Sequence, residues 1–177
     1  QENTIQSHQL QFIHKLGKFW LLDLTGIVSE NTSTSESFTS RNFKLDNYTF
    51  HPMVSYVYNT NSRFETFYIL KSKENRIGAM EFLKTHTLGA NFLIANKEKA
   101  SLTANINVIF NEFEGNQNSP VAFQMLEGLQ AGTNYTWTLN LQKKLTSYLD
   151  INLNYLGRKS ETSKAIHTGT LQLRASF

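Results

Sequence analysis

Oxygen-bearing side chains recur at every second position in one segment of the chain. Glu112, Glu114, Asn116 and Asn118 surround Gly115, and carboxylate and amide oxygens are the ligands that hard cations such as calcium favour. The spacing does not match an EF-hand, and a solvated polar loop explains it equally well. The chain has no cysteine, which excludes thiolate metal sites and a disulfide scaffold. We therefore predict no metal site and no cofactor.

Histidine could supply a catalytic base. The five histidines are His8, His14, His51, His86 and His167, and no two of them have zinc-ligand spacing on one strand. A membrane-embedded lipid hydrolase would need a base such as His167 near Ser160 or Ser163, with an orienting Asn. The alternation described next places His167 on the apolar face, where packing accounts for it. We predict no catalytic residues and no enzyme, and a lipid hydrolase is the least favoured alternative.

Alternation of apolar and polar residues predicts the elements that position these side chains. The clearest stretch has Tyr135, Trp137, Leu139 and Leu141 at odd positions, with Asn, Thr and Gln between them. A period of two places each set on one face of a strand. The pattern recurs along the chain and predicts about nine strands of ~9–13 residues, longer than the ~5–6 usual in globular sheets. Ile13, Phe67 and Ile69 break the alternation, because they are apolar residues at positions predicted to lie on the polar face.

Long alternating strands are compatible with two architectures, a soluble β-sandwich and a transmembrane β-barrel. The predicted connections alternate between short and long, as the turns and loops of outer-membrane barrels do. Aromatic residues gather towards both strand ends, which is typical of two membrane interfaces. The longest apolar runs, of which Phe19–Leu22 is one, are too short for a spanning helix, which needs ~20 residues. We therefore predict an all-β, antiparallel transmembrane barrel over residues 1–177.

The C-terminal residues resemble a known class of protein. The last predicted strand, Ile166–Phe177, ends on Phe after alternating apolar residues, and this resembles the C-terminal signature of Gram-negative outer-membrane β-barrels. The stretches "YTWTLNLQKKL", "NLNYLGRKSETSKAIHTG", "QLRASF" and "NSPVAFQMLEGLQAG" resemble the C-terminal segment of large Bacteroidota outer-membrane proteins. The resemblance implies location in the cell outer membrane, and reading of Phe177 as an assembly signal by the barrel-assembly machinery. It also implies outer-membrane lipid and further outer-membrane or surface proteins as partners.

Nine strands are an odd number, whereas bacterial single-chain barrels usually have an even one. Either one strand is misread and eight form a small closed barrel for adhesion or membrane integrity, or the chain is the C-terminal part of a larger barrel. We favour the second alternative. The expected function is then a structural or channel component of a surface transport or secretion assembly. The net charge of +3 is too small to indicate a nucleic-acid partner.

The predicted loop Glu112–Gly132 contains a helix signal. Ser119 followed by Pro120 is typical of a helix start, and Gly128 of a helix stop, so Pro120–Glu127 is predicted to be helical. The loop also contains five apolar residues, namely Val121, Phe123, Met125, Leu126 and Leu129. They are predicted to form a lid in the barrel mouth, a docking surface for a partner protein, or a loop that packs on neighbouring loops.

Charged residues on the polar face of the predicted strands are expected to face the barrel lumen. They are Asp23, Arg63, Glu65, Lys71, Asp150, Arg158 and Arg174. In a narrow barrel such charges form a paired filling, because buried charges are costly unless paired. In a wide barrel they line a transport pathway, and the sequence leaves both alternatives open.

Overall fold

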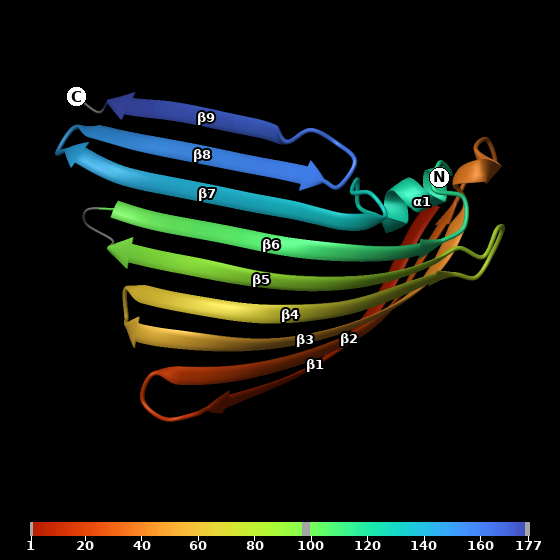
Figure 1. Ribbon diagram of the computed structural model, residues 1–177, viewed down its shortest axis with the longest axis horizontal. Coiled ribbons are helices and arrows are strands. Elements are labelled where there is room, and N and C mark those ends of the chain that lie inside the picture. Colours follow the sequence, from red (N-terminus) through yellow and green to blue (C-terminus); the bar gives the residue numbers. More distant parts are fainter. Residues whose placement is uncertain (1, 97–99, 176–177) are drawn as a thin grey trace.

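The computed structural model describes residues 2–96 and 100–175, which form one antiparallel sheet (Figure 1). Its strands in these ranges are β1 (Glu2–Lys15), β2 (Trp20–Thr34), β3 (Phe43–Asn59), β4 (Ser62–Asn75), β5 (Phe82–Asn96), β6 (Ala100–Glu114), β7 (Gly132–Thr146), β8 (Leu149–Ser160) and β9 (Ile166–Ala175). A short 3₁₀ helix, η1 (Thr39–Arg41), follows β2, and one α-helix, α1 (Pro120–Met125), follows β6. The predicted all-β antiparallel fold is confirmed, and with lengths of 10 to 17 residues most strands are longer than predicted.

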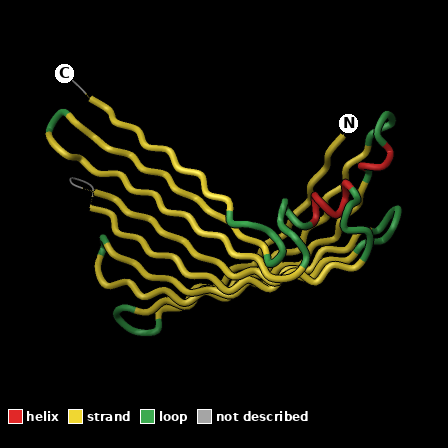
Figure 2. The backbone as a smooth tube through the Cα atoms, turned by 45° about the horizontal axis from the view of Figure 1, so that its top comes forward, coloured by secondary structure: helices red, strands yellow, loops and turns green. Residues whose placement is uncertain are grey.

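Each strand pairs with its neighbours in the sequence, in the order β1 to β9. Within the described residues, β1 pairs only with β2 and β9 only with β8. The sheet curves into an open trough whose two rims are β1 and β9 (Figure 2), so closure into a barrel is not observed. Because an odd number of antiparallel strands leaves β1 and β9 running the same way, direct pairing of the rims would be parallel, unlike every other pair.

The connections differ systematically between the two ends of the strands. Residues 35–42, 76–81, 115–131 and 161–165 connect strands at one end, here called the long-loop end. The connections at the other end, the short-turn end, include the turns at residues 16–19, 60–61 and 147–148. The connections that the structure describes therefore follow the predicted alternation of short and long.

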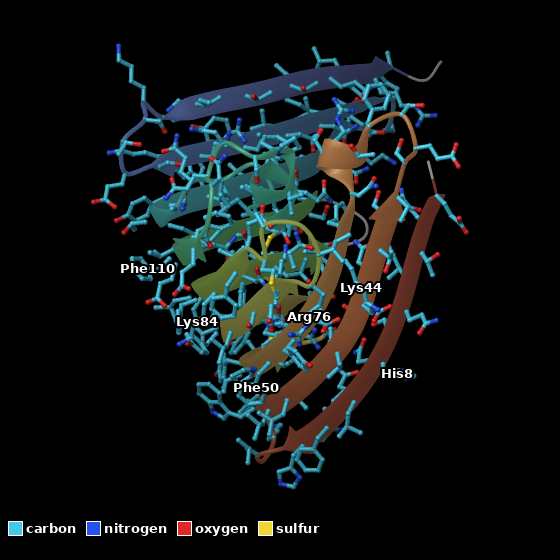
Figure 3. All side chains as sticks on the ribbon, turned by 90° about the vertical axis from the view of Figure 1, so that its right-hand side faces the viewer. His8, Lys44, Phe50, Arg76, Lys84 and Phe110 are labelled. Carbon is cyan, nitrogen blue, oxygen red and sulfur yellow. The ribbon has the colours of Figure 1, made fainter. Side chains whose placement is uncertain are left out.

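The two faces of the sheet have opposite character. The convex face carries exposed apolar side chains, for example Leu88 (62% exposed), Ile106 (58%) and Leu171 (61%). Asn and Thr predominate on the concave face. Figure 3 looks onto the long-loop end, where the strands trace an arc and Phe50 and Phe110 point away from it. A soluble domain buries its apolar face, so this sheet has the reverse arrangement.

The three apolar residues that break the alternation, Ile13, Phe67 and Ile69, lie on the concave face. Phe67 lies directly opposite Gly89 on the next strand, and a Cβ atom at Gly89 would collide with the Phe67 ring. Trp137 stands in the same relation to Gly157 on the convex face. An aromatic ring therefore covers a glycine on each face, which fills the space left by the missing side chain.

The apolar core is small and lies on the concave side at the long-loop end. It joins residues of β3 and β5 to residues of the segment around α1, namely Leu45, Leu83, Val121, Met125 and Leu126, with Phe43 and Phe113 packed beside them. Among the described residues, no helix has the length and apolar character needed to cross a membrane.

Candidate functional site

Helix α1 lies in the hollow of the trough at the long-loop end (Figure 2). Its N-cap is Ser119, whose hydroxyl accepts a 3.0 Å hydrogen bond from the Ala122 amide, and Pro120 occupies the first turn. Glu127 (φ 55°) and Gly128 (φ 76°) adopt left-handed conformations that turn the chain away after the helix. The helix is two residues shorter than predicted, and residues 115–131 together are called the lid below.

The apolar residues of the lid divide into two groups. Val121, Met125 and Leu126 are buried, and they pack on Leu45 and Leu83 of the sheet. Phe123 is 69% exposed, and Leu129 is half-buried. Three of the five predicted contact residues therefore hold the lid against the concave face, while Phe123 remains available to solvent or to another molecule.

Two lysines of β4 hold the C-terminal end of α1. The Lys73 ammonium donates to the Met125 carbonyl oxygen (2.8 Å) and to a Glu127 carboxylate oxygen (2.7 Å). Lys71 donates to the same carboxylate oxygen at 3.1 Å. A cation near the last carbonyls of a helix compensates its negative end. Burial alone would raise the pKa of Glu127, but the hydrogen bonds and charges of the two lysines outweigh it and lower this pKa.

The N-terminal end of α1 is attached through a buried carboxylate. Ser119 donates from its hydroxyl to one oxygen of Glu81 (3.3 Å), and the Asn75 side-chain amide donates to the other (2.7 Å). Asn75 and Glu81 are 1% and 2% exposed. The helix cap is thus connected to the β4–β5 connection by a hydrogen-bonded network, as a buried polar group requires.

A third attachment joins the end of the lid to β6, β7 and β8. The Gln130 carbonyl accepts hydrogen bonds from the side-chain amides of Asn111 (3.0 Å) and Asn134 (2.8 Å). The Ser160 hydroxyl donates to the Asn134 amide oxygen at 2.6 Å, and Arg158 reaches the Gly128 carbonyl oxygen at 3.5 Å. The lid is therefore held at both of its ends and along α1.

The seven residues predicted to line a lumen lie on the concave face, on β2, β4, β8 and β9. Asp23 accepts hydrogen bonds from Gln11 (2.6 Å) and Thr25 (3.0 Å). Arg63 forms an ion pair with Glu65 at 3.2 Å, and Asp150 is the cross-strand partner of Arg174. Lys71 and Arg158 bond to the lid instead.

Uncharged side chains connect the middle of the concave face. The Asn91 amide donates to Glu65 (3.0 Å), Asn105 donates to Asn91 (2.6 Å), and Asn107 donates to both Asn105 (2.7 Å) and Thr136 (3.0 Å). This chain of hydrogen bonds crosses from β4 to β7, so the polar parity of four strands forms one connected surface.

Two of the residues considered for catalysis, His167 and Ser160, lie on opposite faces of the sheet. Nδ1 of His167 lies 2.7 Å from the Tyr155 hydroxyl on the convex face, whereas Ser160 bonds to Asn134 on the concave face. The Asn116 side chain accepts a hydrogen bond from the Asn118 amide, and no group of three or more His, Asp or Glu residues able to hold a metal occurs in the described part of the chain. Phe177, the predicted assembly signal, lies outside the described residues.

Sequence reasoning missed most of the attachments of the lid. The sequence pattern predicted no role for Lys73, Glu127, Asn75 and Glu81. Leu45, however, indicates where the lid packs. It is an apolar residue on the otherwise polar face of its strand, and the same holds for Leu83 and Phe113. Three such exceptions at the same end of three strands, beside an apolar loop, indicate an internal contact.

Compared with known proteins, the chain matches no family model and gives no significant match to a curated protein.

Proposed function

We propose that this chain forms part of the wall of an outer-membrane β-barrel, and that it serves as a structural or channel component of a surface transport or secretion assembly. The observation that carries the proposal is the reversed character of the two faces. Monomeric soluble proteins rarely expose contiguous apolar patches above a few hundred Å², whereas a barrel wall turns its apolar face to hydrocarbon and its polar face to the lumen.

The placement of aromatic rings on the convex face supports the proposal. At the short-turn end, Trp20 contacts Tyr56 with ring centroids 4.9 Å apart, and Phe19 lies 5.9 Å from the same ring. Towards the long-loop end, Tyr48 and Phe50 are exposed on the same face. Aromatic side chains with one apolar and one polar side favour the two membrane interfaces, and the strands between these groups are long enough for a tilted span.

The open rims of the sheet favour a larger barrel over the small closed one. Hydrocarbon cannot satisfy the unpaired backbone groups of an exposed strand edge, so a sheet that crosses a membrane has to close. Because β1 and β9 run in the same direction, antiparallel closure requires an odd number of further strands between them. The resulting even total is the usual number for bacterial barrels.

The lid has a defined place in this proposal. It covers the concave face at the long-loop end and narrows the mouth of the lumen there, while the exposed Phe123 offers a contact for a partner at the surface. Neither a small adhesion barrel nor a lipid hydrolase is favoured by an observation of comparable weight.

Fluorescence quenching in membranes tests the proposal, because both tryptophans lie on the convex face. In a closed barrel that contains this chain together with the strands that complete it, variants with Trp137 or Trp20 as the only tryptophan are reconstituted into vesicles that carry nitroxide lipids at shallow or deep positions. We expect a deep nitroxide to quench Trp137, which lies well inside β7, most strongly. A shallow nitroxide should quench Trp20, the first residue of β2, most strongly.

The matched control places the only tryptophan on the opposite face of the same strand, as Thr138→Trp with both native tryptophans replaced by Phe. We expect little quenching of this concave position by either lipid. Equal quenching of Trp137 and of the Thr138→Trp position, or none of either, would contradict a lipid-facing convex surface.

A further inference from the structure

A pocket of about 300 Å³ lies on the concave face, between the sheet and the C-terminal end of α1. On the sheet side, Ser29 of β2 is opposite Asn47 of β3, which is opposite Lys73 of β4. Gln124 and Glu127 of the lid complete the lining. Small-molecule sites have volumes of ~300–1,000 Å³, so the pocket accommodates a small molecule rather than a polymer.

The charges that line this pocket do not balance. Lys71 and Lys73 donate to the same carboxylate oxygen of Glu127, at 3.1 and 2.7 Å. The other lining residues, which come from β2, β3 and α1, carry no charge. Two ammonium groups therefore face one carboxylate, and the excess positive charge favours an anionic ligand.

The pocket also offers hydrogen-bonding groups to a ligand. An ammonium group has three protons, and among the described contacts Lys71 donates one of them and Lys73 two. Asn31, Asn47 and Ser29 line the wall formed by β2 and β3. The Asn47 amide donates to the Ser29 hydroxyl at 3.3 Å, and a hydroxyl that accepts can still donate its own proton. Amides and hydroxyls of this kind match the hydroxyl groups of a hydrophilic ligand.

We propose that this pocket binds a small carboxylate that carries several hydroxyl groups, such as a sugar acid. The ligand carboxylate would accept hydrogen bonds from Lys71 and Lys73 and balance the excess charge, while its hydroxyl groups contact β2 and β3. A phosphate monoester, with a charge of about −2, would exceed that balance beside Glu127. The role of the pocket as an entry site to the lumen rests on the proposed function, whereas the binding itself does not.

Occupancy of the pocket is coupled to the attachment of the lid. The ligand carboxylate and Glu127 compete for the same two ammonium groups, and their like charges repel. Binding therefore weakens the hold of β4 on α1. Because coupling between two interactions is reciprocal, removal of the Glu127 charge should strengthen ligand binding.

Isothermal titration calorimetry of the closed barrel that contains this chain, in detergent micelles, tests the site with glucuronate and glucose. These two sugars differ only in the carboxylate. We expect glucose to bind about tenfold more weakly than glucuronate, and Lys71→Gln to weaken glucuronate binding by a similar factor, the usual effect of a lost charged hydrogen bond. Lys84→Gln removes a lysine from the convex face of β5. It is the matched control and should bind glucuronate like the wild type.

The Glu127→Gln variant separates a competing carboxylate from a supporting one. We expect it to bind glucuronate about threefold more tightly than the wild type at the same ionic strength, because a nearby like charge is removed. Weaker binding by Glu127→Gln would overturn the proposal, as would equal binding of glucose and glucuronate or an unchanged Lys71→Gln. A preference for glucose 6-phosphate over glucuronate would overturn the carboxylate ligand.

The Glu127→Gln comparison keeps the test valid if Lys71→Gln does not fold. The site and the proposed function fail separately. If Trp137 is quenched by lipid but glucuronate does not bind, the pocket proposal alone fails; if glucuronate binds and Trp137 is not quenched, the membrane proposal alone fails.

Discussion

Two glycines of the sheet differ sharply in what surrounds them. The position of a Cβ atom at Gly89 overlaps the Phe67 ring and a side-chain oxygen of Asn107, whereas at Gly26 it meets nothing. Glycine is thus required at one position by a cross-strand aromatic ring, and at the other it leaves a hollow.

We expect Gly89→Ala to destabilise the sheet by about 1–3 kcal/mol, the usual cost of forcing extra volume into a packed site. Gly26→Ala is the matched control and should change stability by less than about 0.5 kcal/mol, as exposed substitutions usually do. Urea unfolding in detergent micelles measures both variants.

Adding Phe67→Leu to Gly89→Ala should restore part of the lost stability, because the smaller side chain leaves room for the new methyl group. If both glycine variants unfold at the same urea concentration, the close packing of Phe67 on Gly89 is wrong.

At the scale of elements, the lid is the segment with the most specific attachments. The lowered pKa of Glu127 means that the folded state favours the ionised carboxylate. The ion pairs with Lys71 and Lys73 therefore stabilise the lid fully above the ordinary value of 4.5. This stabilisation is lost as the pH falls below 4.5 and through the lower pKa of the folded state.

We expect hydrogen exchange of α1, corrected for the intrinsic effect of pH, to accelerate as the pH falls from 6 to 3. The Glu127→Gln variant should exchange faster at pH 6 and respond less to acidification than the wild type, since it lacks the carboxylate that pairs with Lys71 and Lys73. The same acceleration in wild type and Glu127→Gln would assign the pH effect to another group.

At the scale of the whole molecule, an introduced arginine is expected to affect stability very differently on the two faces of the sheet. In a bilayer, Ile106→Arg in the middle of β6 should cost about 2–4 kcal/mol, the penalty for Arg at the lipid face near the midplane. Asn140→Arg lies on the concave face of the adjacent β7 and should be tolerated.

The measurement is unfolding in lipid vesicles by urea, followed by tryptophan emission. In a soluble sheet Ile106 would be an exposed side chain, and its replacement by Arg would have almost no effect. Similar stabilities of Ile106→Arg and Asn140→Arg would therefore contradict a membrane-facing convex surface.

The sequence by itself determined the strands, their faces, and the start of α1. These features are local, because alternation has a period of two along one strand and a Ser-Pro cap acts within one helical turn. Even the exceptions were visible: Phe67 and Ile69 stood out from their strand, although the glycine that requires the aromatic ring lies on another strand.

Only the tertiary structure decided where the lid lies, what holds it, and that the sheet is open at β1 and β9. Lys73 and Glu127 are separated by 54 residues, and no local pattern connects them. Strand parity states which face a residue occupies but not which distant segment covers it, because such contacts depend on the curvature of the whole sheet. For the same reason, the hollow at Gly26 exists only because β1 to β4 lie side by side around it.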